Sequence, residues 1–548
     1  MSPFAPTTHL ATHDVGNQPG DLVDRNLYAD DIALREAVLR EAGAWLDERA
    51  MRLGAVVGSQ AVVALGQDAN RFPPELTSFD RFGRRIDEVR FHPSYHALMA
   101  LATDHEIHSL AWTTRQPGGH VAHAALLAVF AQSEAGTMCP INMTYAAVPA
   151  LRVEPNLTAA WIAKVLSGCY DAPLRPIEGK AGVTLGMAMT EKQGGSDVRA
   201  NTTRADARQD GTYGLTGHKW FCSAPMSDGF LTLAQAPGGL TCFLVPRIAP
   251  DSTRNGIRLM RLKDKLGNRS NASAEIEYED AAAFRLGPEG SGVKVIIDMV
   301  HHTRLGTIAC TLGIMRAALS QAVHHTSRRM AFGKPLIAHP LMTAVLADLA
   351  LDYEAAVVLV MRVARAFSAT DESERAFARL GVALAKYWLT KRCSNFVYEA
   401  MECLGGAGYV EDGPMPRLYR EAPLNAIWEG SGNVIALDVL RTLAREPAAR
   451  AAYEAELAPA LGIHAAFDSA AQILREAMSE TAPAEARARH LVERMAVMLQ
   501  AALLIRYAPS AVSDAFCMAR IAPDHAFSYG ALACNVDLVA IMDRQTLC

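Results

Sequence analysis

The sequence predicts a mostly helical protein that is interrupted once by a compact β domain. Three observations support this prediction: apolar residues recur at helical spacing up to about residue 181, strand-like segments follow up to about residue 290, and helical spacing then returns. With 548 residues the chain is too long for one ordinary core, so several packed units are expected. Half of the residues are hydrophobic and 20% are charged, which is the balance of a globular protein.

Four units are expected in order along the chain. They are an N-terminal helical domain (1–181), a middle β domain (182–290), a C-terminal helical bundle (291–447) and an appended helical domain (448–548).

The elements follow from local patterns. Apolar residues at helical spacing predict helices from about Leu34 to Ala172. Strands are predicted at Phe230–Ala234, Thr241–Val245 and Ala274–Tyr278, because these segments alternate or run apolar between Gly, Pro and Asp. After residue 291, apolar residues again recur at helical spacing over long stretches. The last hundred residues are rich in alanine with interspersed Glu and Arg, which favours further helices.

Charge and cysteine usage exclude several function classes. With 53 Lys+Arg against 58 Asp+Glu, the net charge is −5, so no general attraction to nucleic acid or anionic lipid is expected. The ten cysteines form no C-x-x-C pair, which favours a reducing compartment without a zinc or other metal module. No signal peptide and no apolar stretch of membrane-spanning length is found, so a cytoplasmic protein is expected.

Two segments of the β region carry groups that suit a ligand. Met189–Asp197 combines two glycines with hydroxyls and paired charges, and such a loop can bring backbone N–H groups close to a flavin rim or pyrophosphate. Taken alone, an ordinary turn is the favoured interpretation. His218–Ser223 offers an aromatic pair and a hydroxyl for a planar heterocycle, although a strand with two core aromatics is the commoner explanation.

Two further segments lie in the helical bundle. Arg329–Gly333 places an arginine and an aromatic ring at a predicted helix end, where the arginine can bind a diphosphate and the glycine ends the helix. Leu404–Tyr409 breaks a helical pattern with three glycines, which costs stability unless the backbone must approach something. It is not a dinucleotide fingerprint, because no strand leads into it and the glycine spacing differs.

The segment Ile427–Asn433 places one carboxylate, Glu429, between a bulky aromatic residue and a flexible turn. Desolvation beside Trp428 raises the pKa of a carboxyl towards the range of a general base. A glutamate at a helix start is the alternative, and it is favoured when this segment is taken by itself.

Together and in this order, the five segments resemble the acyl-CoA dehydrogenase family, whose pattern is M-T-E-x-x-x-G-S-D, K-x-[WF], R-x-x-F-G, G-G-x-G-Y and [YW]-E-G. The resemblance covers roughly Asp14 to Arg445, and it is closest to the alkylation-response AidB branch in Arg90–Pro93, Thr190–Val198, Arg261–Ser273 and Ile427–Asn433. It implies a helical domain, a β-barrel and a helical bundle, with FAD between them and a homotetrameric assembly.

Site residues are carried over by matching position. The resemblance implies Glu429 as the catalytic base, Arg304, Trp428 and Gly430 at the substrate, and no metal. Arg329 and Phe332 are implied to reach the FAD of a neighbouring subunit, and Leu404–Gly406 to lie near the FAD phosphates. The implied cofactor-binding set is Met187, Met189, Thr190, Gly195, Ser196, Trp220, Phe221, Ser223, Arg329, Phe332, Leu404, Gly405, Gly406, Ile427, Ser431 and Asn433.

The implied reaction is dehydrogenation of an acyl-CoA or related thioester. Glu429 removes the α-proton while the β-hydride passes to flavin N5, and an electron-transfer flavoprotein is the implied electron acceptor. The Glu429 backbone N–H and a flavin hydroxyl polarise the thioester carbonyl in the family. Many family members carry the smaller tyrosine at the position of Trp428, so low turnover on ordinary acyl-CoAs is expected.

Two alternatives to a working dehydrogenase remain. The AidB resemblance implies a DNA-associated protective flavoprotein, and a third hypothesis is a flavoprotein in which FAD only stabilises the fold. From Ala449 onward the chain has eight arginines, no lysine and eleven acidic residues, one of them Glu480, so this region is net negative. A strong counterion-release contribution to DNA binding is therefore not expected unless assembly clusters the arginines.

Overall fold

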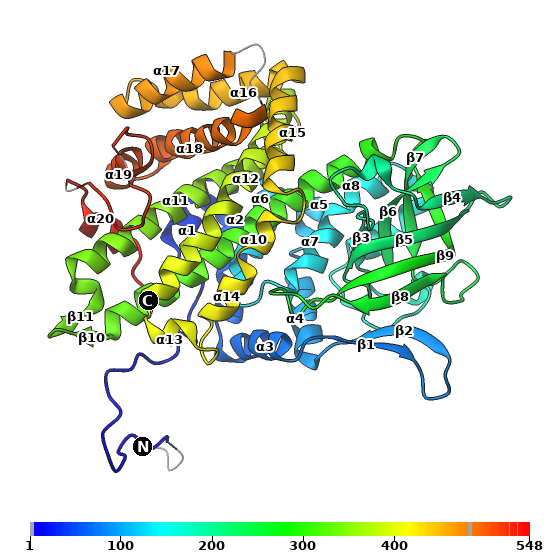
Figure 1. Ribbon diagram of the computed structural model, residues 1–548, viewed down its shortest axis with the longest axis horizontal. Coiled ribbons are helices and arrows are strands. Elements are labelled where there is room, and N and C mark those ends of the chain that lie inside the picture. Colours follow the sequence, from blue (N-terminus) through cyan, green and yellow to red (C-terminus); the bar gives the residue numbers. More distant parts are fainter. Residues whose placement is uncertain (1–4, 480–484, 525, 534, 548) are drawn as a thin grey trace.

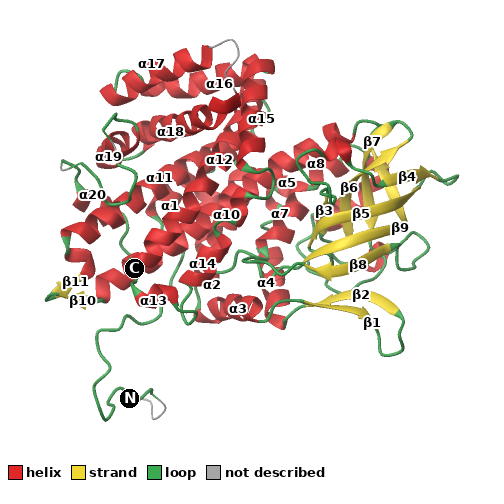
Figure 2. Cartoon of the chain, in the orientation of Figure 1, coloured by secondary structure: helices red, strands yellow, loops and turns green. Residues whose placement is uncertain are grey.

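The computed structural model describes residues 5–479, 485–524, 526–533 and 535–547, so Glu480 lies outside the described part. Figure 1 shows a central body of long helices, with the barrel against one side and the last helices against another. Figure 2 shows that strands are concentrated in the barrel and that helices make up most of the rest. The predicted fold class, mostly helical with a central β-barrel and appended C-terminal helices, is confirmed, whereas the four domain boundaries stay a prediction.

Nine helices build the N-terminal part of the described chain. The side chains of Asp31 and Ser59 accept hydrogen bonds from backbone N–H groups in the first turns of α1 and α3, which fixes where these helices begin. All residues of α6 are buried, because it runs through the middle of the helical core. The bounds are α1 (Ile32–Glu41), α2 (Ala44–Val57), α3 (Gln60–Arg71), α4 (Pro93–Asp104), α5 (Leu110–Thr113), α6 (Gly119–Ala131), α7 (Met138–Ala146), α8 (Val148–Leu151) and α9 (Pro155–Val165).

The prediction of helices throughout this part was wrong at one place. A β-hairpin, β1 (Glu75–Phe79) and β2 (Arg85–Arg90), separates α3 from α4 and pairs antiparallel. Its turn is closed by Asp80, whose side chain accepts hydrogen bonds from the backbone N–H groups of Phe82 and Arg84. Both strands are short, and neither alternates strictly between polar and apolar residues, so the local pattern did not distinguish them from the helical segments on either side.

The barrel is a closed ring of five strands with two strands attached. The ring runs β4, β5, β9, β7, β6 and back to β4, while β3 pairs with β6 and β8 pairs with β9. Most contacts are antiparallel, and the β6–β7 hairpin pairs over its full length. The bounds are β3 (Leu185–Ala188), β4 (Arg204–Ala207), β5 (Tyr213–Ser223), β6 (Gly229–Ala236), β7 (Gly239–Pro246), β8 (Ile257–Leu262) and β9 (Ser273–Leu286).

Three long helices form the centre of the C-terminal bundle and pack on one another, and the first two of them also pack on α6. They are α10 (Gly292–Arg328), α11 (Pro340–Ser368) and α12 (Glu372–Glu402). A small hairpin of β10 (Met330–Ala331) and β11 (Lys334–Pro335) follows α10, and α13 (Gly406–Tyr409), α14 (Met415–Glu421) and α15 (Gly432–Arg445) follow α12. The 3-10 turns are η1 (Ile177–Gly179), η2 (Val198–Ala200), η3 (Leu336–Ala338), η4 (Leu424–Ala426), η5 (Ala458–Ala460) and η6 (Glu485–Arg487).

The appended region covers α11, α12 and α15 rather than forming a separate body. Its helices are α16 (Pro447–Leu457), α17 (Ala465–Ser479), α18 (Ala488–Tyr507), α19 (Ser510–Arg520) and α20 (Leu538–Asp543). Buried ion pairs join the two parts, since Arg520 contacts Asp348 and Asp352 of α11. Among the described residues, no helix combines the length and the apolar character needed to cross a membrane.

Candidate functional site

The turn that carries Glu429 lies between η4 and α15. Glu429 has φ 58° and Gly430 has φ 106°, so two successive residues adopt left-handed backbone conformations. A glycine tolerates this conformation, whereas a glutamate adopts it only at a cost of about 1–3 kcal/mol. Such strain persists only where the surroundings fix the backbone, and here two buried cations do so.

Arg304 and Lys386 hold the two carbonyl groups of this turn. Arg304 Nε of α10 donates to the carbonyl oxygen of Glu429 at 3.1 Å, and Lys386 Nζ of α12 donates to that of Gly430 at 2.5 Å. Both cations are buried. Arg304 and Arg379 also donate to Asp438 of α15 at 2.9 and 2.7 Å, which ties the first turns of that helix to the same cluster. The turn is therefore fixed by three helices.

The Glu429 carboxylate is partly buried and has one hydroxyl partner. Thr303 Oγ1 donates to Glu429 Oε2 at 2.6 Å. Burial raises the pKa of Glu429 above its ordinary value, and the Thr303 hydrogen bond and the charges of Arg304 and Lys386 partly offset this. Burial also lowers the pKa of Lys386 to about 7. A carboxylate with a raised pKa beside a held backbone can accept a proton near neutral pH.

Trp428 forms one wall of this site. Its indole N–H donates to the buried Asn425 at 3.0 Å, so the ring is held in one orientation. The ring packs against an apolar cluster between α7–α9 and the barrel, and Met187 of β3 and the following Met189 pack against the same cluster. The fold thus brings the Glu429 turn and the predicted flavin loop to one place, although they are more than 200 residues apart in sequence.

On the barrel side, a buried ion pair shapes the predicted flavin loop. Glu191 contacts Lys219 at 2.9 Å, and both side chains are inaccessible to solvent. Burial raises the pKa of Glu191, but hydrogen bonds from Thr202, Thr203 and Lys219 outweigh it and hold the pKa at about 2. The backbone N–H of Trp220 donates to the carbonyl of Thr190 at 2.7 Å, which joins this loop to β5.

The remaining barrel residues of the predicted site are accessible. Gly195 and Ser196 lie in the exposed loop, and Ser223 ends β5. Phe221 is 45% exposed, and Ile427, in the turn before Trp428, is 65% exposed. Ser431 and Asn433 are exposed at the start of α15. Exposed apolar side chains, hydroxyls and a helix N-terminus are the kinds of group that a flat, partly polar molecule can cover.

Cations surround Trp220 on the outer face of β5. Lys263 Nζ lies 3.3 Å from the centre of the Trp220 ring, and Lys192 and Arg261 lie 5.8 and 5.6 Å from it. Lys263 and Arg261 share the carboxylate of Glu275. The ring is therefore fixed by its cation neighbours, beside Phe221 rather than in a hydrophobic core.

Five predicted residues lie far from Glu429 within the chain. Arg329 and Phe332 follow the end of α10 at Arg328, 24 residues after Arg304 (328 − 304), which is about 36 Å along the helix axis. Leu404, Gly405 and Gly406 follow the far end of α12 and are largely exposed, with Gly405 at φ 59°. The structure does not bring these residues to the Glu429 turn of the same chain.

Sequence reasoning missed several residues that fix the site. Thr303 immediately precedes Arg304, which was predicted to lie at the substrate. Its position next to that residue was a signal that could have found it. Lys386 is a lone cation within an apolar helical stretch, which signals a buried role. Asp438 gives no local signal, because its partners lie 134 and 59 residues away.

Family models match three consecutive parts of the chain. Residues 17–172 match the Adaptive response protein AidB N-terminal domain, residues 186–281 the Acyl-CoA dehydrogenase middle domain, and residues 290–444 the Acyl-CoA dehydrogenase C-terminal domain. The fold and the site therefore define a protein of the acyl-CoA dehydrogenase family, and the chain belongs to it.

Within that family, the chain is similar to AidB of Escherichia coli (strain K12), with 45% identity over 512 residues that cover 93% of this chain and 94% of AidB. Acyl-CoA dehydrogenase family member 11 of Caenorhabditis elegans is 31% identical over 81% of this chain and 77% of its own length. A crystal structure of ACDH-11 from Caenorhabditis elegans in complex with C11-CoA superposes with a TM-score of 0.84 at 28% identity and covers 99% of both chains.

Proposed function

We propose that this protein is an FAD-dependent dehydrogenase that converts an acyl-CoA or a related thioester into its 2-enoyl thioester. The observation that carries the proposal is the partly buried Glu429 carboxylate, bonded to Thr303 in a turn that Arg304 and Lys386 hold. The acyl-CoA complex of the Caenorhabditis elegans protein supports the substrate class. We further propose that Glu429 is the base.

The residues of the site fit a flavin. The hydroxyls of Thr190, Ser196 and Ser223 suit the polar edge and phosphates of FAD, while the exposed Phe221 and Ile427 suit its flat ring. A Cβ at Gly195 would lie 2.4 Å from Thr190 Oγ1, so glycine keeps this part of the loop compact. An acyl-CoA dehydrogenase from Bacillus anthracis complexed with FAD shares the fold, with a TM-score of 0.62 at 17% identity.

In this proposal the protein supplies the base and its alignment, and bound FAD accepts the hydride from the β-carbon. Glu429 removes the α-proton, and the electrons of that C–H bond form the new double bond. The left-handed turn fixes the direction of the carboxylate and of the Glu429 backbone N–H, which can polarise the thioester carbonyl. Burial of the carboxylate, next to Trp428 in the sequence, keeps its pKa raised.

The charge partners of the appended region argue against DNA binding as the principal function. Arg506 contacts Glu456, Arg520 contacts Asp348 and Asp352, and Arg544 contacts Glu354 and Glu36. Arg450 is paired with Glu454. At least half of the eight arginines after Ala449 are thus engaged by carboxylates and are poorly available to phosphates.

Anaerobic visible spectroscopy tests the proposal. The purified protein loaded with FAD is mixed with short, branched and long acyl-CoAs, and the oxidised flavin band is followed. Bleaching by one class of chain is expected, and it would rank the substrates. A protein that binds FAD but is never bleached by any thioester would refute the dehydrogenase proposal.

A further inference from the structure

A separate cavity of about 400 Å³ lies between the β1–β2 hairpin, α4, the segment 170–174 and one end of the barrel. Small-molecule sites commonly have volumes of about 300–1,000 Å³, so a small organic molecule fits. None of the residues predicted for the flavin or the substrate lines it. Ala224 of its wall directly follows Ser223, so the cavity adjoins the segment that carries one of the predicted flavin residues.

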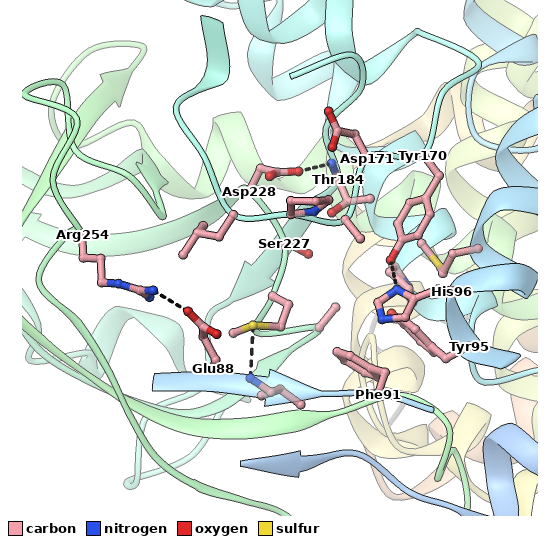
Figure 3. Close-up of a pocket in the computed structure, with 18 residues that line it drawn as sticks. Glu88, Phe91, Tyr95, His96, Tyr170, Asp171, Thr184, Ser227, Asp228 and Arg254 are labelled. Carbon is pink, nitrogen blue, oxygen red and sulfur yellow. Dashed lines mark hydrogen bonds and ion pairs between the residues drawn. The ribbon is translucent and has the colours of Figure 1, made fainter. Parts of the chain in front are cut away.

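One side of the cavity is built from aromatic rings (Figure 3). Phe91 and Tyr95 stack with ring centres 4.0 Å apart and an interplanar angle of 14°. His96 Nδ1 and the Tyr170 hydroxyl are hydrogen-bonded at 2.9 Å. The thioethers of Met99 and Met226 add polarizable surface to this wall. Such a wall favours a flat ring, because aromatic rings stack on one another and thioethers contact ring edges.

A buried hydroxyl provides one polar contact point. Ser227 is 2% exposed, and its Oγ has no hydrogen-bond partner among the described residues. Leaving a buried hydroxyl unpaired is unfavourable, so rotation of the Ser227 side chain towards a ligand atom in the cavity would be stabilised. His96 offers its second ring nitrogen on the aromatic side, and burial lowers the pKa of His96, which keeps the ring neutral.

The charges of the wall cancel one another. Arg254 is the only Lys or Arg among the described residues that line the cavity, and it is paired with Glu88. Asp228 contacts Lys180 at 2.9 Å, and Asp171 contacts Arg175 at 2.6 Å. Among the described lining residues, no free cation is left for a phosphate or carboxylate, and no free carboxylate for an amine. This balance disfavours both nucleotides and charged amines.

We propose that this cavity is a second ligand site, which binds an uncharged, flat aromatic molecule with one hydrogen-bonding edge. The ring lies against Phe91, Tyr95 and Tyr170, and the polar edge meets the Ser227 hydroxyl and the His96 imidazole. The site is independent of the proposed dehydrogenation, because its walls contain no residue assigned to that reaction.

The test uses the full chain loaded with FAD and indole as the probe, with benzoate as an anionic probe of similar size. Binding is measured by isothermal titration calorimetry and by saturation-transfer NMR. Indole is expected to bind saturably and benzoate at least tenfold more weakly. Absence of indole binding would overturn the proposal, and benzoate binding of equal strength would overturn the uncharged class.

Three variants locate the probe. Ala172→Trp places a large side chain at an exposed position of the wall and is expected to weaken indole binding at least tenfold. Ala451→Trp, at an exposed position of α16, is the matched control and is expected to bind as the unaltered protein does. Ser227→Ala is expected to weaken binding about fivefold, the net effect of one hydrogen bond. If indole binds equally well to Ala172→Trp and Ala451→Trp, it binds outside this cavity, and that result would refute the site.

Discussion

Glu429 and Phe332 were both predicted to serve the substrate or cofactor, and the chain holds the Glu429 turn and the β10–β11 hairpin, at whose tip Phe332 lies, very differently. Around Glu429, side chains from α10, α12 and α15 converge, and the cations under the turn are buried. At the hairpin, Phe332 is 96% exposed with φ 48°, and its ring has no core to enter. The first part is completed within one chain, whereas the second leaves its aromatic ring on the surface of this chain.

The hairpin is nevertheless anchored by the N-terminal segment. The side-chain amide of Asn17 donates to the carbonyl of Met330 at 2.9 Å and accepts from its N–H at 2.6 Å, as a neighbouring strand would. Its own carbonyl accepts from Arg329 at 2.5 Å. This contact spans 313 residues of sequence, so the N-terminal segment orients the side chains that are predicted to reach a neighbouring FAD. Arg304 and Lys386 thus form a buried clamp under the Glu429 turn, whereas Asn17 alone anchors the hairpin. We expect three effects of decreasing size from this difference.

The largest effect is expected at Arg304. Arg304→Met leaves Asp438 with Arg379 as its main remaining partner and leaves the Glu429 carbonyl without its donor, so the free energy of unfolding should fall by about 3 kcal/mol. Urea unfolding measures this. Arg441→Met is the matched control. Arg441 is exposed and comes no closer than 4.0 Å to Asp438, so this variant should change stability by less than about 0.5 kcal/mol. Equal losses in both variants would show that the clamp is not specific to the turn.

A smaller effect, on activity, is expected at Lys386. Its charge lowers the pKa of Glu429, so Lys386→Met raises that pKa and moves the acid limb of kcat to higher pH. Because the pKa of Lys386 is about 7, the difference from the unaltered protein is largest below pH 7 and shrinks above it. A loss of roughly tenfold in kcat is expected at pH 6. The exposed Lys294→Met is the control, and an unshifted acid limb in Lys386→Met would contradict this role.

The smallest effect is expected at Asn17. Asn17→Ala removes two hydrogen bonds to Met330 and should raise the dissociation constant of FAD roughly three- to tenfold without changing the fold. Gln18→Ala changes the next, exposed residue and should leave FAD affinity unaltered. Equilibrium dialysis of FAD measures both. If the two variants bind FAD equally well, the hairpin does not serve the cofactor, whereas a chain that binds no FAD at all would instead refute the proposed function.

Local patterns predicted the parts of this molecule that depend on local chemistry. The strands at Phe230–Ala234, Thr241–Val245 and Ala274–Tyr278 lie within β6, β7 and β9, because alternation and turn residues are local signals. The segments around Thr190 and Glu429 were found as motifs, and the fold brings them to one apolar cluster. Their roles in binding and catalysis stay predictions.

The residues that fix the site could not be predicted in the same way. Thr303 meets Glu429 across 126 residues, and Lys386 meets Gly430 across 44, so both contacts arise from how α10 and α12 pack under the turn. The unpaired Ser227 likewise depends on an arrangement of the hairpin, α4 and the barrel that no local pattern encodes. The β1–β2 hairpin was missed because its strands are short and lie between strong helical periods.

The role of Glu429 as base is tested most directly by exchange of the substrate α-proton. The FAD-loaded protein and Glu429→Gln are incubated in D2O with a thioester that bleaches the flavin, or with an analogue that cannot lose its β-hydride, and deuterium at the α-carbon is followed by NMR. The unaltered protein should exchange, and Glu429→Gln should lose exchange by about 10²–10⁴-fold while keeping the spectrum of bound FAD. Equal exchange by both proteins would show that Glu429 is not the base.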